Sequence, residues 1–124
     1  MTNIIITDLA QKLTKFSDLW SPKIVAELNE SYIKLAKLKG EYVWHKHDNE
    51  DEMFLIIKGE LKIELRDKVL CLKRGNMVVI PRGIEHRPIA DSEVHVMLIE
   101  PKTTISTGDS KSTEGKKSTQ GEWI

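Results

Sequence analysis

From Lys23 onward, the sequence is a series of short stretches rich in Ile, Val, Leu and Tyr that are separated by turn-forming residues. The separators include Lys39-Gly40, Lys58-Gly59 and Arg74-Gly75, and glycine at such positions interrupts regular structure. Many short strands at hairpin-length spacing are typical of a β-sandwich or barrel, so the sequence predicts an all-β fold. The expected strands cover residues 24–26, 32–38, 42–47, 53–57, 61–65, 69–72, 77–80 and 94–99.

A different pattern precedes these strands. Leu9, Leu13 and Phe16 recur at helical spacing, with Lys12 and Lys15 between them. This pattern predicts a short amphipathic helix over residues 8–16, and we expect its apolar face to cover one opening of the barrel.

After Pro101, the composition changes to Ser, Thr, Gly and Lys. Taken alone, residues 102–122 resemble a disordered segment, but Trp123 and Ile124 follow them. We expect Trp123 to anchor this tail in an apolar groove, on the same chain or on a partner subunit, because so few apolar residues cannot form a core of their own. A tail without such a docking site is the alternative. The chain thus divides into a helical capping segment over 1–22, a barrel domain over 23–101 and a polar tail over 102–124.

Size and charge limit the number of domains and the classes of partner. With 124 residues, 40% of them hydrophobic and 31% charged, the chain suits one domain with a single core. Lysine plus arginine equals aspartate plus glutamate at 19 each, so no net charge attracts nucleic acid or an anionic membrane. No stretch approaches the roughly 18 apolar residues of a membrane span, and residues 1–10 lack the pattern of a secretory signal. We therefore expect a cytoplasmic protein that binds neither nucleic acid nor membrane.

Cys71 is the only cysteine. An intrachain disulfide and a cysteine-rich zinc site are therefore excluded, and any metal ion must be bound by histidine and carboxylate side chains. Because Leu70 and Leu72 flank it, we expect Cys71 to be a buried, unreactive thiol.

Three of the four histidines lie in two short clusters that glycines bracket. Residues two apart on a strand share a face, so His45 and His47 are predicted to point the same way, about 7 Å apart along the strand. The residues Pro81-Arg82-Gly83 favour a tight turn that brings His86 round to face the first cluster. The three imidazoles are thus predicted to converge on one point.

One carboxylate from the acidic stretch Glu50-Asp51-Glu52 completes the group. We favour Glu52 because it begins the apolar stretch Met53 to Ile57, whereas Glu50 and Asp51 lie in the preceding loop. A single histidine in a strand is usually an ordinary surface or core residue, and an acidic stretch alone is usually a solvated loop. Four metal-binding side chains in two clusters instead favour a metal site with three imidazole nitrogens and one carboxylate oxygen.

The two clusters resemble the two sequence motifs of the cupin superfamily. Here they read Gly40-x4-His45-x-His47-x4-Glu52-x6-Gly59 and Gly75-x5-Pro81-x-Gly83-x2-His86. The resemblance implies a jelly-roll β-barrel and one divalent metal ion, Zn, Ni, Mn or Fe. It assigns as ligands His45, His47, Glu52 and His86.

The sequence departs from the family pattern in three places, and none of them removes a ligand. The spacer after Gly40 is one residue shorter than usual. Asn76 stands where the family frequently has Asp, and Ala90 stands where it has a terminal Asn. These changes affect turn and hydrogen-bonding residues, so they concern the placement of the second motif rather than the fold.

Three imidazoles and one carboxylate leave one or two open positions on an octahedral ion, where chemistry can take place. Among cupins similar to this chain, such a metal activates oxygen or water, or orients a hydroxyl and a carbonyl for isomerisation, as in members that resemble mannose-6-phosphate isomerase. We therefore expect a metal-dependent enzyme, a dioxygenase or an isomerase, that acts on a small polar metabolite. The alternatives are a module that binds or senses a small molecule without turnover, and a barrel that the metal only stabilises.

Three further side chains are candidates for acting on this small-molecule ligand. His95 is a candidate general base, although the alternation of its strand leaves open whether it points inward or lies on the outer surface. Arg82 and Arg87 flank His86 and are candidates for binding a carboxylate or phosphate of the substrate through bidentate hydrogen bonds. Their alternative role is that of solvent-exposed rim residues.

Barrels of this size often pair through an edge strand or an apolar outer face. Trp44 alternates with His45 and His47, so we expect it to face away from the metal, against another sheet or subunit. Together with the segments around Trp20 and Trp123 it provides candidate surfaces, and we expect a homodimer.

Overall fold

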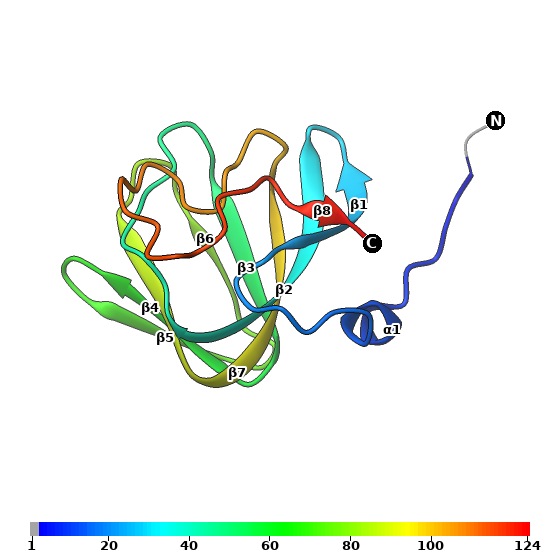
Figure 1. Cartoon of the computed structure of the whole chain (residues 1–124), viewed down its shortest axis with the longest axis horizontal. Helices are drawn as coiled ribbons and strands as arrows, with labels where there is room; N and C mark the ends of the chain where they lie inside the picture. The colour runs from blue at the N-terminus through cyan, green and yellow to red at the C-terminus, as the bar shows by residue number, and fades with distance from the viewer. Residues whose placement is uncertain (1–2) are drawn as a thin grey trace.

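A computed structural model of the chain describes residues 3–124 and confirms an all-β fold with one short helix (Figure 1). The helix α1 covers Leu9–Leu13. Within the described residues, no helix has the length and apolar character that crossing a membrane requires. The strands are β1 (Lys23–Leu28), β2 (Ser31–Glu41), β3 (Glu52–Lys58), β4 (Glu60–Leu65), β5 (Val69–Lys73), β6 (Met77–Ile80), β7 (His86–Pro101) and β8 (Glu122–Trp123).

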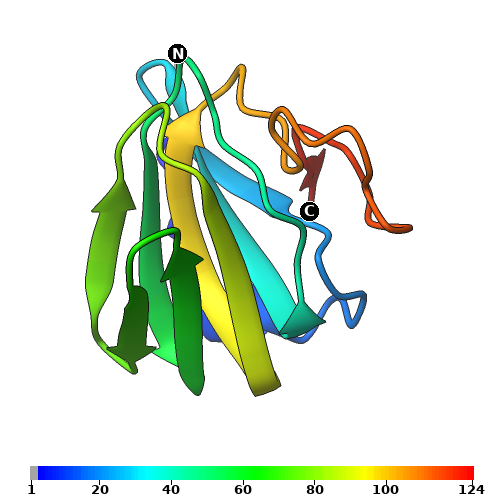
Figure 2. The same ribbon diagram turned by 90° about the vertical axis from the view of Figure 1, so that its left-hand side faces the viewer.

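The long strand β7 joins the parts of the barrel, because it pairs antiparallel with three other strands. One edge of β7 follows β2. The other edge pairs first with β4 and then, beyond a bend, with β3. The outer strands extend from these partners, β5 from β4, β6 from β3 and β1 from β2. The strands therefore enclose a common interior in the manner of a jelly roll (Figure 2).

The interior is filled by alternate residues of the strands. On β7, Val94, Val96 and Leu98 are buried, whereas the residues between them are half-buried on the opposite face. On β3, Phe54 and Ile56 are buried in the same way. Full burial of one such side chain stabilises the fold by about 1.5–3 kcal/mol. The contiguous core comprises Trp20, Ala36, Leu38, Tyr42, Val43, Phe54, Ile56, Leu61, Ile63, Leu72, Ile80, Ala90, Val94, Val96 and Leu98.

Two segments differ from the predicted strands. Residues 42–47 do not form a regular strand; within this range His45 pairs with His86 in an isolated bridge. The ladder between β2 and β7 shifts register near Gly40, which has a φ of 85° that favours glycine. The last long strand begins at His86 rather than Val94, because its first residues pair with β4.

The predicted helix is present but shorter, and its predicted role is wrong. Asp8 caps its start by accepting a hydrogen bond from the Gln11 backbone N–H at 3.2 Å. None of its residues is buried, and Figure 1 shows it beside the barrel rather than over an opening. Trp20, seven residues further on, enters the core instead. Its ring stacks on Tyr42 at 4.6 Å, and its indole N–H donates to the Lys39 carbonyl at 2.9 Å.

The C-terminal tail docks on its own chain, but not by burying Trp123. It crosses one side of the barrel (orange to red in Figures 1 and 2) and ends in β8, which pairs in parallel with β1. Lys23 of β1 donates hydrogen bonds to Asp18 and to Glu122 of the tail. The Trp123 side chain is 54% exposed and meets the ring of Tyr32 edge-on at 5.8 Å. Backbone pairing and an ion pair therefore hold the tail, rather than an apolar groove.

Cys71 is exposed, so the prediction of a buried thiol is wrong. The strand β5 alternates, with Leu72 buried and Leu70 half-buried on the face that meets the core. Apolar neighbours in sequence therefore place Cys71 on the opposite, solvent-facing side.

Candidate metal centre

Three different segments carry the four predicted ligands. His45 and His47 lie in the irregular segment between β2 and β3, Glu52 opens β3 and His86 opens β7. The backbone N–H of His45 donates to the His86 carbonyl at 3.1 Å, and the N–H of His86 donates to the His45 carbonyl at 2.9 Å. The Gly83 N–H donates to the His47 carbonyl at 2.8 Å. These backbone bonds bring the two histidine clusters together, as their spacing predicts.

The four side chains converge inside the barrel. One ligand atom from each of the four lies within 4.8 Å of the others, and all four residues are buried. The imidazole centroids of His45 and His86 are 4.4 Å apart, and those of His45 and His47 are 5.0 Å apart. The Oε1 atom of Glu52 lies 3.3 Å from His86 Nε2 and 3.7 Å from His47 Nε2. The contacts of the other two carboxylates agree with the choice of Glu52 as the ligand. Glu50 accepts a hydrogen bond from Thr103, and Asp51 accepts one from Arg82.

Hydrogen bonds fix which ring nitrogens face the centre. The Nδ1 atom of His45 lies 2.8 Å from the Val43 carbonyl, and Nδ1 of His86 lies 2.9 Å from the Ile84 carbonyl. A carbonyl oxygen only accepts hydrogen bonds, so each Nδ1 carries the proton and each Nε2 keeps a free lone pair. Such backbone partners are usual for histidines that bind a metal through the other nitrogen.

A buried nitrogen without a partner tests whether the group suits a metal ion. Within the described residues, Nε2 of His47 is buried and has no hydrogen-bond partner. A buried polar atom left in this state costs about 1–3 kcal/mol, and a divalent ion among the four donor atoms would remove that cost. Three imidazoles and one carboxylate also suit Zn, Ni, Mn or Fe by donor type. The residues therefore fit one divalent ion.

Burial determines the protonation of the four side chains. It lowers the pKa of His45 to about 3, with the nearby His86 acting in the same direction. Burial also lowers the pKa values of His47 and His86. The imidazoles are thus neutral at physiological pH, which is the form that binds metals. Burial raises the pKa of Glu52, against the effects of Glu100 and Lys34.

An ion pair beside this group was not predicted from the sequence. Lys34 of β2 donates to Oε1 of Glu100 at 2.7 Å, and the two side chains are 1% and 2% exposed. Burial and the adjacent charge of Glu52 raise the pKa of Glu100 well above its usual range. The alternation of inward- and outward-facing residues along β7 could have revealed that Glu100 is buried, because Glu100 continues the inward series of Val96 and Leu98. A buried carboxylate on an apolar face needs a partner.

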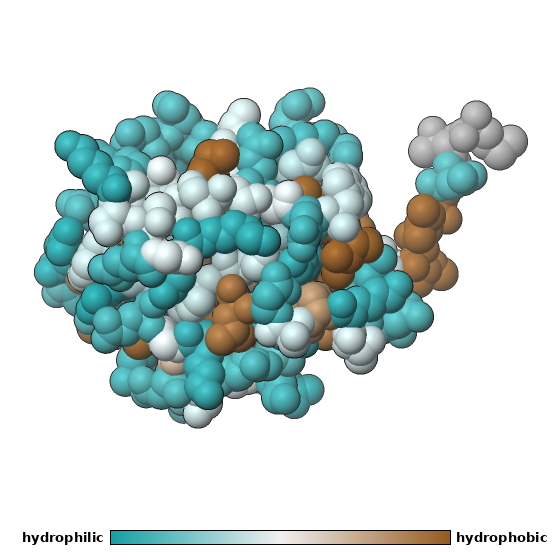
Figure 3. Space-filling view, in the orientation of Figure 1, coloured by the Kyte–Doolittle hydropathy of each residue, from teal (hydrophilic) through white to brown (hydrophobic). Residues whose placement is uncertain are grey.

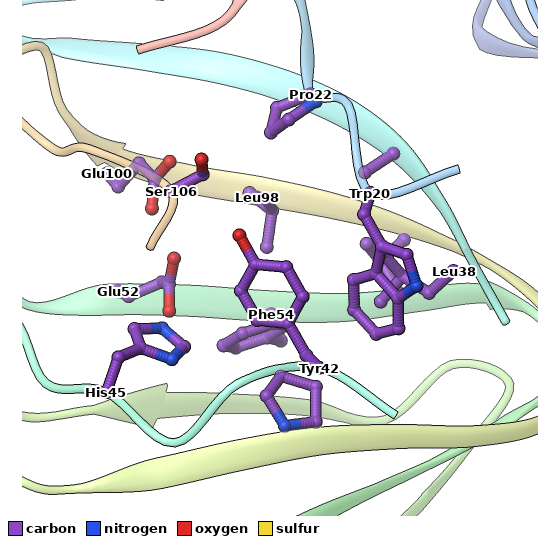
Figure 4. A pocket seen from close by; sticks show the side chains of 13 residues that line it. Trp20, Pro22, Leu38, Tyr42, His45, Glu52, Phe54, Leu98, Glu100 and Ser106 are labelled. Carbon is purple, nitrogen blue, oxygen red and sulfur yellow. The ribbon is translucent and has the colours of Figure 1, made fainter. Parts of the chain in front are cut away.

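A small cavity, with about 40 Å³ of room for the centre of a water-sized molecule, lies next to the four side chains, and His45 and Glu52 form part of its wall (Figure 4). Figure 4 shows polar side chains at one end of the cavity and Trp20 and Leu38 at the other. Ser106 contributes to the wall from the C-terminal tail. The cavity is lined by Trp20, Pro22, Ala36, Leu38, Tyr42, His45, Glu52, Phe54, Pro88, Val96, Leu98, Glu100 and Ser106.

The structure does not bring His95 to this group. His95 lies on β7 between the inward-facing Val94 and Val96, so its side chain is on the outer face of the sheet. Its Nε2 lies 2.7 Å from a carboxylate oxygen of Glu93. Of the two orientations that alternation left open, the structure has the outer one.

The two arginines also lie outside the lining of the cavity. Arg82 is exposed and bonds Asp51 through its backbone N–H at 2.9 Å and its Nε at 3.3 Å. Arg87 donates twice to Oε1 of Glu64, at 2.8 and 2.6 Å. Its guanidinium also lies 5.5 Å from the ring of Trp44, which faces away from the centre as predicted. Both arginines are thus paired with carboxylates of the chain itself.

Fold and site together define a class: a small single β-barrel with a buried group of three histidines and one glutamate that can hold a metal ion. The cupin domain family matches residues 33–102. Since this range spans more than half of the chain, the protein belongs to the cupin superfamily, as its two motifs predict.

Two relatives are similar in sequence. The uncharacterized protein YdbB of Bacillus subtilis (strain 168) is 36% identical over 84 residues, which cover 67% of this chain and 68% of YdbB. Acireductone dioxygenase 4 of Oryza sativa subsp. japonica is 35% identical over 68 residues, which cover 51% of this chain and 36% of that protein. The second match thus spans about a third of the larger enzyme.

Solved structures share the fold over most of the chain. A cupin-2 domain containing protein from Shewanella frigidimarina is 43% identical, with a TM-score of 0.77, and the match covers 77% of this chain and 94% of that one. Protein NMB1881 from Neisseria meningitidis is 28% identical, with a TM-score of 0.72, and the match covers 78% and 99% of the two chains. The barrel described here is therefore nearly the whole of those proteins.

Proposed function

We propose that the protein binds one divalent ion, Zn, Ni, Mn or Fe, through His45, His47, Glu52 and His86 and uses it to act on a small molecule. The observation that carries the proposal is the convergence of four buried ligand atoms within 4.8 Å of one another. Four protein ligands, each binding through one atom, leave two coordination positions free on an octahedral ion and one on a five-coordinate ion. The cavity beside His45 and Glu52 is where we place the small molecule.

The reaction class that we propose is oxygenation. The relative from Oryza sativa that is 35% identical over 68 residues is named a dioxygenase. A bound iron, manganese or nickel ion supplies Lewis-acid and redox chemistry toward oxygen. An isomerase-type reaction stays a prediction from the resemblance alone.

The chain's own residues hold the ion and exclude water. His45 and His86 present Nε2 because backbone carbonyls occupy their Nδ1 atoms. Lys34 neutralises Glu100, which borders Glu52. The apolar walls that Phe54 and Leu98 contribute keep the cavity poor in water, and electrostatic interactions are stronger in such surroundings.

The test is oxygen consumption by protein loaded with Fe, Mn, Ni or Zn, measured with an oxygen electrode against a panel of enols and phenols. We expect uptake with at least one redox-active ion and at least one compound, and none with zinc. His47→Ala should abolish both the metal content and the uptake. A protein that binds metal and panel compounds without consuming oxygen would instead fit the alternative, a non-catalytic module that binds or senses a small molecule.

We also propose a homodimer, supported by the N-terminal arm. The side chains of Ile4, Ile5 and Ile6 are 97%, 77% and 96% exposed on a segment that leaves the barrel (Figure 3). Three consecutive β-branched residues suit pairing with the edge of a sheet in a second copy. Trp20 is excluded as an interface residue because it lies in the core. Light scattering should give twice the mass of one chain for the full-length protein, and the mass of one chain for a variant that lacks residues 3–7.

The cytoplasmic location of the protein stays a prediction.

A further inference from the structure

The cavity beside the candidate metal centre has an unequal distribution of polar groups. Nine of its thirteen lining residues are apolar or aromatic, and they include Trp20, Leu38 and Phe54. The four others lie together at the end where Glu52 is found, as Figure 4 shows: His45, Glu52, Glu100 and Ser106. A ligand that fills this space therefore needs an apolar body and one polar end.

The charge of the lining argues against anionic ligands. Among the lining residues, all within the described part of the chain, there is no lysine or arginine. Lys34 is buried behind Glu100, to which it donates at 2.7 Å. Arg82 and Arg87 are paired with Asp51 and Glu64 away from the cavity. A phosphate or carboxylate placed among the apolar side chains, away from the candidate metal centre, would lose its hydration without gaining a cationic side chain, which is strongly unfavourable.

Two buried polar atoms of the lining residues have no hydrogen-bond partner within the described residues, Oε2 of Glu100 and the hydroxyl of Tyr42. Tyr42 is 5% exposed, and its hydroxyl forms no hydrogen bond of normal geometry within the described residues. Burial raises the pKa of Tyr42 to about 12, and the side chain of Ser106, its polar neighbour, acts in the opposite direction. The ring of Tyr42 is held between Trp20, stacked at 4.6 Å, and His45, edge-on at 5.4 Å. In Figure 4 the hydroxyl points into the cavity, towards the end where Glu52 and Ser106 lie. A ligand oxygen in that region would satisfy it.

We propose that the cavity takes a neutral small molecule with a planar, apolar body and an oxygen at one end, such as a phenol or an enol. The body packs against Trp20, Tyr42 and Phe54, and the oxygen reaches the Tyr42 hydroxyl on its way to the ion. This inference rests on the proposed function for the role of the oxygen. It replaces the polar metabolite that the sequence predicts, because sugar phosphates find no cationic side chain in this wall.

Binding of three probes tests the inference: 4-methylphenol, toluene and mannose 6-phosphate. Ligand-observed NMR gives their dissociation constants for metal-loaded and for chelator-treated protein. We expect 4-methylphenol to bind at least about tenfold more tightly than mannose 6-phosphate in both forms, since the apolar wall does not depend on the ion. Equal or tighter binding of mannose 6-phosphate, or no binding of either aromatic probe, would overturn the proposal.

Substitution of the two tyrosines locates the polar contact. Tyr42→Phe should weaken the binding of 4-methylphenol by roughly three- to tenfold, which corresponds to the loss of one hydrogen bond. The affinity for toluene should stay unchanged within about twofold. Tyr32→Phe is the matched control, because Tyr32 lies outside the cavity lining, and it should affect neither probe. An unchanged affinity of Tyr42→Phe for 4-methylphenol would contradict the role of the hydroxyl.

Metal content of the same samples separates this inference from the proposed function. A protein that takes up metal but prefers mannose 6-phosphate would refute the ligand class and leave the metal site standing. A protein that takes up no metal but prefers 4-methylphenol would refute the metal-dependent function and support the apolar cavity.

Discussion

His45 and His86 exchange two backbone hydrogen bonds, at 3.1 and 2.9 Å, and their rings lie 4.4 Å apart. This isolated bridge joins the segment after β2 to the first residue of β7. The positions of the two imidazoles are therefore set by main-chain pairing rather than by side-chain packing alone. Any change that moves the backbone at His45 should also change the geometry of the candidate metal centre.

The C-terminal tail contacts the same backbone, so we predict that Gly108→Ala disturbs the centre. A Cβ at Gly108 would lie 2.4 Å from the Lys46 carbonyl oxygen and 3.0 Å from His45 Cδ2, and φ is +54° there. We expect a loss of more than about 2 kcal/mol in the free energy of unfolding, since left-handed strain alone costs about 1–2 kcal/mol. Chemical denaturation and metal titration measure the two effects.

Gly115→Ala is the matched control for that substitution. Gly115 also has a positive φ, of +79°, but a Cβ there meets nothing within 4 Å. Gly115→Ala should lower the free energy of unfolding by the backbone strain of about 1–2 kcal/mol and leave the metal affinity unchanged. Equal effects of the two substitutions on metal affinity would show that the tail does not support His45.

The second prediction concerns the buried ion pair. Lys34→Met leaves the Glu100 carboxylate without its partner, at a cost of about 3–5 kcal/mol in the free energy of unfolding. The double variant Lys34→Met/Glu100→Gln should recover much of that loss, because no charge is then buried. Lys102→Met, which removes an exposed pair with Glu27 at 2.9 Å, should cost less than about 1 kcal/mol. Similar losses for Lys34→Met and Lys102→Met in urea denaturation would contradict this account.

A third prediction is that tail docking depends on pH. Hydrogen bonds from Lys23 lower the pKa values of Asp18 and Glu122. A carboxylate whose pKa falls on folding stabilises the folded form above its unfolded pKa, and this contribution is lost as the pH falls through the folded value. The tail should therefore be docked at neutral pH and detach below about pH 4. The NMR signal of the Trp123 indole N–H reports docking.

Lys23→Met serves to assign that transition. With the ammonium removed, Asp18 and Glu122 lose their partner, and the tail signal should no longer change as the pH falls below about 4, other than by global unfolding. Persistence of the wild-type transition in Lys23→Met would mean that other groups control docking.

The barrel and the four candidate ligands were predictable from the sequence because both depend on local patterns. Alternation places His45 and His47 on one face even though residues 42–47 are not a regular strand. Turn residues and the start of an apolar strand locate His86 and Glu52. Such patterns are properties of a few neighbouring residues and survive in the folded chain.

Features that depend on distant contacts were not predictable in this way. Alternation shows that His95 and Val94 point to opposite sides, but only packing decides which side is inside. The pair of Lys34 and Glu100 joins residues that are 66 positions apart. The tail likewise docks through β1, and its polar composition gives no sign of a partner strand.

The most direct test of the central claim is the metal content of two histidine variants, measured by elemental analysis after purification and after loading with one divalent ion at a time. We predict one ion per chain in the wild type and in His95→Ala, whose imidazole lies on the outer face beside Glu93. We predict near-complete loss in His86→Ala, together with the loss of the thermal stabilisation that the ion gives the wild type. Equal metal content in His86→Ala and His95→Ala would contradict the account.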